Sequence, residues 1–320
     1  MGAVVNHAAA RARILIAALA LALTVVLLSA QAAVAEVRVT ASIPPIHSLV
    51  AQVMASVGSP RLLVPAGTSP HGFSLTPSQA RMLADAEVVI WVGPALETAL
   101  AKPVATLAQK ARVVTLAAEQ ALVRYPARRL GEGHDHGHDH GHDHGLAGED
   151  PHYWLDPVNA QAMVAAIAKT LAQADPANAD RFKANAEAAT AGLAAMTKEF
   201  QARLARVKDR PFVVFHDAYQ YLEKRFGLHT AGVLAIDPDR PSGARHIAEL
   251  RDRIRHMNVA CLFTEPQFSS RLTDTLIEGT QARVGVLDPL GNQLAPGPNL
   301  YRQMMTANLT SLADCLGGTP

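Results

Sequence analysis

The sequence predicts an α/β fold with two halves, each built on a mainly parallel sheet, for three reasons. Short apolar segments rich in β-branched residues alternate with segments of helical spacing, which is the pattern of parallel strands connected by helices. The chain has 320 residues, a length more natural for two domains than for one. Hydrophobic residues make up 49% of it and aromatic residues 5%, as expected for an α/β architecture.

The N-terminal segment has the features of a secretory signal. Two arginines precede an apolar run at 14–28, and Ala33-Val34-Ala35 fits the small-x-small rule for cleavage. The alternative is a permanent anchor, but the run is short for a membrane span, which needs about 20 residues. We expect residues 1–35 to be removed before Glu36 and the mature protein to reach the periplasm of a Gram-negative cell.

Strands and helices alternate through the first half, 36–174. The segment 37–43 is apolar and β-branched at alternate positions, and 46–57 has the apolar spacing of a helix. The alternation continues with strands at 61–64, 87–92 and 112–115 and with helices at 77–84, 95–110 and 158–174.

A long helical segment separates the two halves. The stretch 176–207 contains one glycine, Gly192, and no proline after the first residue. Asp175 can cap a helix, and Pro176 suits the first helical position. We expect one rigid helix of about 48 Å over 176–207, in a linker that spans 175–208; two shorter helices broken near Gly192 are the alternative. The second half, 209–320, resumes the alternation with strands at 212–215, 228–233, 260–264 and 284–287.

A histidine-rich segment, 131–150, interrupts the first half. Its central run, HDHGHDHGHDH, has almost no apolar surface and cannot fold on its own. Imidazole is the commonest side-chain metal ligand and favours copper and zinc. We interpret the segment as an auxiliary metal-binding loop, with a solvated spacer as the alternative. Because a flexible loop has no fixed geometry, selective binding needs a second, rigid site. The histidines of the loop are His134, His136, His138, His140, His142 and His144.

Four candidate donors lie in loops that can supply a rigid site. His71 follows the second predicted strand, His216 and Asp288 directly follow later strands, and His152 lies just past the histidine-rich segment. Ligands in open α/β sheets gather at the carboxyl ends of the strands. Zinc needs three or four nitrogen or oxygen donors with neutral imidazoles. Taken singly, a loop histidine is more often structural than a ligand, so spacing alone leaves each candidate open.

The chain contains two cysteines, Cys261 and Cys315. In an oxidising compartment a single pair is most simply a disulfide. A thiolate metal site is the alternative.

Six segments in the chain form a recognisable set. They are 69–78 (SPHGFSLTPS), 86–94 (AEVVIWVGP), 152–157 (HYWLDP), 212–219 (FVVFHDAY), 263–268 (FTEPQF) and 287–291 (LDPLG). Together they resemble the ZnuA type of periplasmic zinc-binding proteins of ABC importers, within the cluster A-I solute-binding proteins.

That family implies two (β/α)4-like lobes joined by a long helix, with metal held in the cleft between them. It implies His71, His152 and His216 as ligands and Asp288 as a carboxylate donor. A histidine-rich loop and paired cysteines also match zinc members.

The resemblance also sets limits on the site. Some zinc members carry an acidic residue just before the first histidine, but here that position is Pro70. The fourth coordination position is therefore left to Asp288 or to water. His216 stands where manganese-binding relatives place a carboxylate, and imidazole there favours zinc. Glu265 is a candidate partner that orients a ligand imidazole; a structural hydrogen bond is the alternative.

The expected function is that of a zinc carrier and not of an enzyme. The carrier would deliver Zn²⁺ to a membrane permease driven by a separate ATPase, since the sequence has no G-x-x-x-x-G-K-[ST] loop. A net charge of +1 gives no reason to expect nucleic-acid binding, and we expect a monomer. The alternatives are a manganese or iron carrier, a three-histidine zinc enzyme, and a secreted adhesin or metal buffer without a permease.

Overall fold

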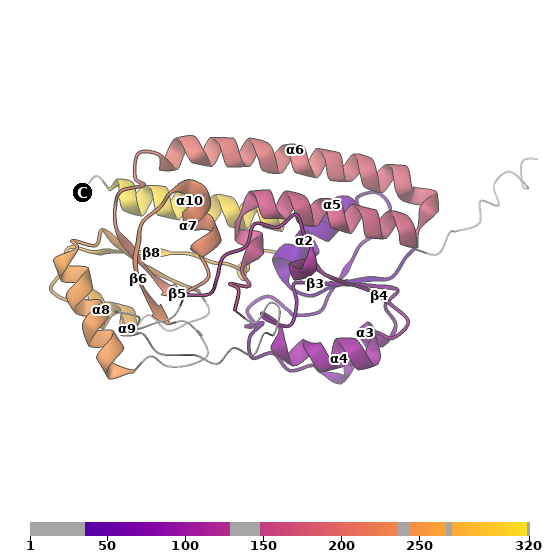
Figure 1. Ribbon diagram of the computed structural model, residues 1–320, viewed down its shortest axis with the longest axis horizontal. Coiled ribbons are helices and arrows are strands. Elements are labelled where there is room, and N and C mark those ends of the chain that lie inside the picture. The colour runs from indigo at the N-terminus through magenta and orange to yellow at the C-terminus, as the bar shows by residue number, and fades with distance from the viewer. Residues whose placement is uncertain (1–35, 129–147, 236–242, 267–270, 319–320) are drawn as a thin grey trace, which may run out of the picture. The chain divides into compact units, whose positions relative to one another are not determined.

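Two four-stranded sheets form the framework of the chain, and their strand pairs are parallel (Figure 1). The computed structural model describes residues 36–128, 148–235, 243–266 and 271–318, and the residues from Val37 onward pack as one compact unit. The strand orders, β2-β1-β3-β4 and β6-β5-β7-β8, show that both sheets have the same topology. The strands are β1 (Val39–Ala41), β2 (Arg61–Leu62), β3 (Val88–Trp91), β4 (Arg112–Thr115), β5 (Phe212–His216), β6 (Thr230–Ala235), β7 (Cys261–Thr264) and β8 (Arg283–Val286).

Helices make most of the crossovers that parallel pairing requires, so the α/β fold predicted from the sequence is confirmed. The helices are α2 (Pro44–Val53), α3 (Pro77–Ala84), α4 (Ala101–Leu107), α5 (Pro157–Ala174), α6 (Ala179–Leu204), α7 (Gln220–Phe226), α8 (Ala244–His256), α9 (Arg271–Ile277) and α10 (Leu300–Gly317). Short 3-10 turns are η1 (Thr98–Leu100), η2 (Leu116–Ala118), η3 (Tyr153–Leu155) and η4 (Pro176–Asn178).

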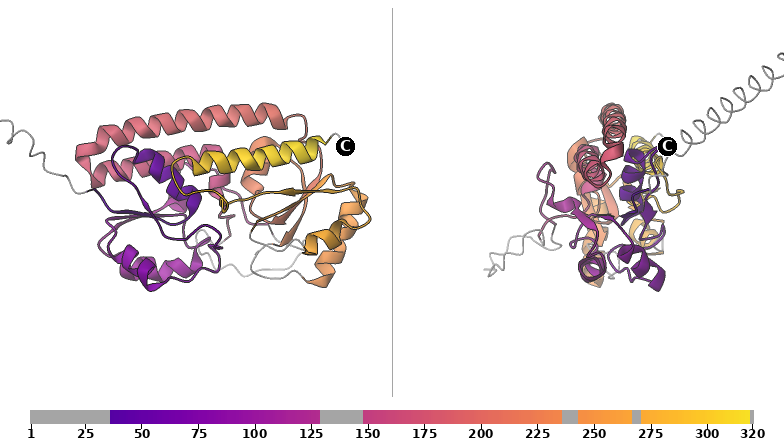
Figure 2. Two further views of the ribbon diagram at one scale, coloured as in Figure 1. Left: turned by 180° about the vertical axis from the view of Figure 1, so that it is seen from behind. Right: turned by 90° about the vertical axis from the view of Figure 1, so that its right-hand side faces the viewer.

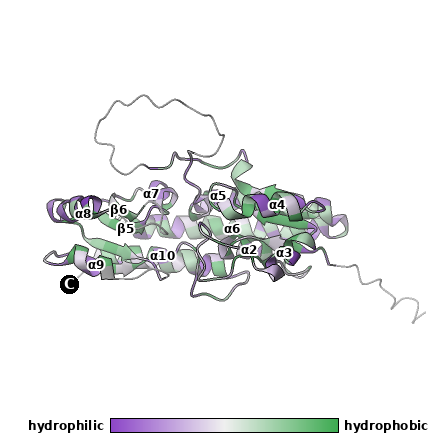
Figure 3. Ribbon diagram, turned by 90° about the horizontal axis from the view of Figure 1, so that it is seen from below, coloured by the Kyte–Doolittle hydropathy of each residue, from purple (hydrophilic) through white to green (hydrophobic). Residues whose placement is uncertain are grey.

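Four helices form a layer that packs against both sheets. Helices α2, α5, α6 and α10 pack against one another, and α2, α5 and α10 contact strands β1, β3 and β8 (Figure 2). Helices α3 and α4 lie on the opposite side of the N-terminal sheet, and α8 and α9 on the opposite side of the C-terminal sheet. Figure 3 shows the apolar character of β5 and β6 beside the hydrophilic residues of α8, which buries only Leu250 and Ile254.

The long helix predicted between the halves is present as α6, although it is shorter at both ends than expected. It begins at Ala179 after the turn η4 and ends at Leu204, which gives 26 residues. Gly192 does not break it, because the helix is held by buried side chains on both sides, including Phe182 and Phe200. The helix lies along α5 and is therefore part of a packed layer, not a free-standing strut.

One continuous apolar core runs through both halves of the chain. It includes Ile46 of α2, Met163 of α5, Phe200 of α6 and Met304 of α10, none of them more than 1% exposed. The helices that pack against both sheets therefore share one core. The domain boundaries proposed after residues 174 and 208 stay predictions.

Cys261 and Cys315 form a disulfide that joins β7 to α10, as expected for a single pair in an oxidising compartment. The two sulfurs are bonded to each other, so they do not offer thiolate ligands to a metal. The bond connects the central part of the C-terminal sheet to the helix layer.

Two predicted segments lie outside the described residues: the signal at 1–35 and positions 131–147 of the histidine-rich loop. None of the helices that the structure describes is both long and apolar enough to cross a membrane.

Candidate metal centre

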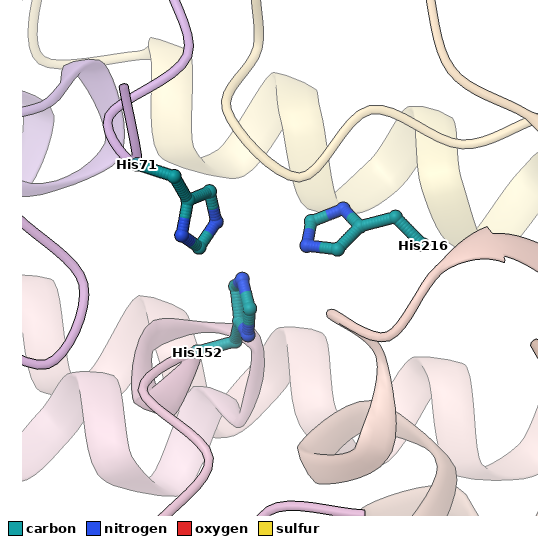
Figure 4. Close-up of side chains that lie close together, drawn as sticks. All are labelled: His71, His152 and His216. Atoms are coloured by element: carbon teal, nitrogen blue, oxygen red, sulfur yellow. The ribbon is translucent and has the colours of Figure 1, made fainter. Parts of the chain in front are cut away.

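Three histidines from separate parts of the chain converge on one point. His71, His152 and His216 each offer a ring nitrogen, and these nitrogens lie within 4.8 Å of one another. Figure 4 shows the three rings pointing toward a common space from different segments. Among the described residues, this is the group of three or more histidine, cysteine, aspartate or glutamate side chains with metal-site geometry. The structure therefore brings together the three histidines singled out in the sequence.

The topology of the C-terminal sheet explains the position of His216. Parallel α/β sheets place ligands where the strand order reverses, which here is between β5 and β7. His216 is the last residue of β5, and Glu265 directly follows β7. The two side chains therefore meet at the carboxyl edge of adjacent strands.

His216 is held by a buried carboxylate. Its Nδ1–H donates to Oε1 of Glu265 at 3.0 Å, and the hydroxyl of Tyr219 donates to the same oxygen at 3.1 Å. A hydrogen on Nδ1 leaves Nε2 with a free lone pair. This Nε2 is buried and has no hydrogen-bond partner within the described part of the chain. An unsatisfied buried polar atom is unfavourable, and a cation in front of it would satisfy it.

His152 is oriented in the same way by Asp150. Oδ1 of Asp150 accepts from the backbone N–H of His152 at 3.0 Å and from its Nδ1–H at 2.8 Å. Asp150 is itself fixed from α7, because Gln220 Nε2 donates to its Oδ2 at 3.2 Å and the Tyr221 hydroxyl donates to its backbone oxygen at 3.0 Å. Two of the three histidines thus have a preset ring orientation.

His71 differs because it lies in the loop between β2 and α3. The far end of this loop is fixed by a capping box, in which Thr76 and Gln79 exchange side-chain and backbone hydrogen bonds, and by buried Phe73. Burial lowers the pKa of His71 to about 2, and the neighbouring rings of His152 and His216 add to this effect. His71 is therefore a neutral imidazole, the protonation state that binds a metal.

Carboxylates dominate the electrostatics around His216. Burial lowers the pKa of His216, but attraction by Glu265, Asp217 and Asp150 outweighs that effect, so the pKa is raised above its ordinary value. A proton and a metal cation thus compete for the same nitrogen. The negative surroundings favour either cation over an empty site.

Asp217 is adjacent to His216 but is already paired. Its carboxylate and that of Glu223 both bind the guanidinium of Arg128, and both carboxylates are almost fully buried. Arg128 lies in the N-terminal half and its two partners in the C-terminal half, so this triad also links the halves.

Asp288 lies outside the three-histidine group. Its Oδ1 accepts from the backbone N–H groups of Leu290 and Gly291 at 3.0 and 2.9 Å, and its Oδ2 accepts from that of Asn292 at 2.6 Å. Burial raises the pKa of Asp288, and the charge of Glu265 contributes to this effect. Its role as a ligand stays a prediction.

The two ends of the histidine-rich segment are joined beside the site. Pro126 pairs with Glu149 in an antiparallel bridge, the N–H of Ala127 donates to the oxygen of Gly148, and the N–H of Asp150 donates to the oxygen of Tyr125. Asp150 thus belongs both to this stem and to the orientation of His152. The histidines between these paired residues lie outside the described residues.

Sequence reasoning missed the residues that hold the ligands in place, apart from Glu265. Asp150 has a local signal, because it stands two positions before His152 in the motif DPH. Arg128 and Gln220 have none, since their contacts with Glu223 and Asp150 bridge 95 and 70 positions of sequence.

The comparisons with known proteins agree with this geometry. The model of the ZnuA family, described as the periplasmic component A of the zinc-uptake complex, matches residues 39–315. The chain belongs to the ZnuA family. The high-affinity zinc uptake system protein ZnuA of Brucella abortus (strain 2308) is 44% identical over 304 residues, with 87% of this chain and 91% of that protein covered. The resemblance seen in the motifs is therefore confirmed.

Two further relatives extend the family comparison. The ZnuA protein of Paracoccus denitrificans (strain Pd 1222) is 39% identical over 306 residues, with 88% of this chain and 92% of that protein covered. A solved structure described as a ZnuA deletion mutant with zinc bound superposes with a TM-score of 0.73 at 24% identity, covering 89% of this chain and 99% of that chain. The architecture of the family is therefore retained at low identity.

Proposed function

We propose that this protein captures Zn²⁺ in the periplasm and delivers it to the membrane permease of an ABC importer. The observation that carries the proposal is the cluster of three buried or half-buried histidines in a chain of the ZnuA family. The 44% identical Brucella relative is named as a high-affinity zinc uptake protein. A separate ATPase would supply the energy for transport, and the predicted signal at 1–35 supports a periplasmic location.

In this proposal His71, His152 and His216 hold the ion. For His152 and His216 the ligand atom is Nε2, because Nδ1 is engaged by Asp150 and Glu265. Zinc is commonly four-coordinate with nitrogen donors at about 2.0–2.1 Å. Since Asp288 lies outside the group of ligand atoms that His71, His152 and His216 form, we assign the fourth position to water.

The donor set favours zinc over the other candidate cargoes. Manganese prefers carboxylate and water ligands, whereas imidazole suits zinc and copper. Three histidines with one open position also occur in zinc enzymes. The relatives found here are transport components, which supports the carrier.

The histidine-rich loop is proposed to bind additional zinc more weakly than the centre. Deleting 133–145 should lower the zinc stoichiometry while leaving one tight site, because the ligands of the centre lie outside the deleted residues and the chain on either side is joined by the Pro126–Glu149 bridge. Competition titration of the full protein and of the deletion variant against a strong chelator measures both quantities. We expect the tightest dissociation constant to stay within a few-fold.

The same titration can contradict the proposal in two ways. If the full protein binds no zinc tightly, the proposed function is wrong. If the full protein binds zinc tightly but the deletion abolishes this binding, the loop supplies a ligand of the tight site. The proposal that the loop binds only additional, weaker zinc would then be wrong.

A further inference from the structure

The turn that follows β8 contacts the two segments of the N-terminal half that carry candidate ligands, those of His71 and His152. One contact is a buried hydrogen bond of 2.7 Å from Trp154 Nε1–H to the oxygen of Pro289. Trp154 is fully buried, and its ring centroid lies 5.3 Å from that of His152. The turn therefore fixes the aromatic side chain against which His152 rests.

The second contact reaches the loop of His71. Oδ1 of Asn292 accepts a hydrogen bond of 2.8 Å from the backbone N–H of Gly67, four residues before His71. Gly67 has a φ of +81°, a left-handed conformation that glycine adopts without strain. The capping box fixes the loop at Thr76, after His71, and the contact with Asn292 fixes it at Gly67, before His71.

The carboxylate of Asp288 closes this turn. It accepts backbone hydrogen bonds from Leu290, Gly291 and Asn292, and the Asn292 side-chain amide donates to its Oδ1 at 3.2 Å. Asn292 is thus held through both its backbone and its side chain while its own oxygen faces Gly67.

Asn308 of α10 anchors this turn to the helix layer. Asn308 of α10 accepts from the N–H of Asp288 at 2.7 Å and donates to its backbone oxygen at 2.8 Å. Asn308 is almost fully buried. The chain of contacts therefore runs from a packed helix through Asp288 to the two histidine-bearing segments.

We propose that Asp288 is a positioning residue of the metal site, and that the turn it closes holds the loops of His71 and His152 in place from the opposite half of the chain. We call the contacts of this turn with the two loops the clasp. The inference rests on the zinc function proposed above. In this role Asp288 does not touch the ion: turning its carboxylate toward zinc would release the N–H groups of the turn and loosen the contact with Gly67.

Zinc release from two turn variants tests the clasp. Asp288→Asn keeps the size of the side chain but loses one of its two acceptor oxygens, and Asn292→Ala removes the bond to Gly67. Each variant should accelerate zinc dissociation roughly three- to tenfold, the factor expected for a net hydrogen-bond contribution. The double variant should be no faster than the faster single one, because both changes act through the same turn. Gln293→Ala, an exposed amide in the same turn, is the matched control and should release zinc at the wild-type rate.

Cobalt(II) absorption separates positioning from coordination. The spectrum of the cobalt-loaded protein should be the same for the wild type, Asp288→Asn and Asn292→Ala, because the donor atoms do not change. A shifted spectrum together with an affinity loss of about 100-fold or more for Asp288→Asn alone would identify a ligand and overturn the proposal.

A His71→Ala background separates positioning from general stability. There, adding Asn292→Ala should have no further effect on zinc dissociation, because the loop it positions no longer carries a ligand. The clasp would be wrong if Asn292→Ala accelerated zinc dissociation as much in this background as in the wild type. It would also be wrong if both turn variants released zinc at the wild-type rate. Tight zinc binding by the wild type would still support the proposed function in either case.

Discussion

Replacing His216 by alanine is expected to weaken tight zinc binding by more than the roughly 10- to 100-fold that loss of a ligand's hydrogen-bond partner costs, because the change removes a ligand itself. The Nε2 of this residue is buried and lacks a hydrogen-bond partner in the described part of the chain, so its lone pair is available to the ion, and alanine offers no donor in its place. Removing one nitrogen donor of three leaves a site that water must complete. Chelator competition on the protein lacking 133–145 gives the affinity of the centre without a contribution from the loop.

His256→Ala is the matched control for this substitution. His256 is an exposed residue at the end of α8 and should leave the affinity unchanged. His71→Ala and His152→Ala should resemble His216→Ala. Unchanged tight binding in any one of the three would remove that histidine from the proposed ligand set.

Zinc affinity is expected to fall as the pH is lowered from about 8 to 5.5, and His216 accounts for the direction. Its pKa is raised above the ordinary 6.5 because Glu265, Asp217 and Asp150 attract a proton more strongly than burial repels it. Below that raised pKa the free protein carries a proton on His216, and zinc must displace it. The apparent affinity should then drop by up to about tenfold per pH unit and level off above the raised pKa.

His71 is expected to contribute nothing to this slope. Its pKa of about 2 keeps it neutral over the whole range, so no proton competes there. Calorimetry in buffers of different ionisation enthalpy counts the protons released when zinc binds. An affinity that stays constant between pH 8 and 5.5, with no proton release, would contradict the assignment of His216 as a ligand.

The sequence predicts the central strands β3 and β7 to within one residue at the ends, because buried parallel strands are nearly continuous apolar runs. Strand β4 has the predicted bounds although it is partly exposed, and β6 lies two residues later than expected. Helix boundaries depend more on local chemistry. Helix α2 begins at Pro44, earlier than expected, because proline is tolerated at the first helical position. It stops at Val53, short of the predicted end, and Ser56 then adopts a left-handed conformation.

A local contact made by a buried side chain explains the largest difference in secondary structure. The helix expected over 95–110 is reduced to η1 and α4, which starts at Ala101. Glu97 is fully buried and accepts a hydrogen bond of 2.9 Å from the N–H of Gly93, so the chain between them is fixed by this contact and not by helix propensity. Such a contact has no periodic signal in the sequence.

The three histidines could be predicted because each stands in a recognisable motif at a strand end or loop. The groups that orient them could be predicted only in part. Glu265 stands directly after a predicted strand and was a candidate, whereas Asn292 has no signal because its partner Gly67 is 225 positions away. Local sequence motifs thus identify the candidate ligands, whereas the geometry of the site depends on how the two halves pack together.

X-ray absorption at the zinc edge tests the central claim most directly. The sample is the protein lacking 133–145, loaded with one equivalent of zinc, so that the histidine-rich loop adds no signal. The account predicts nitrogen and oxygen neighbours at about 2.0–2.1 Å with the multiple-scattering pattern of three imidazoles and no sulfur. A sulfur neighbour at about 2.3 Å, or a shell with a single imidazole, would contradict a centre built from His71, His152 and His216.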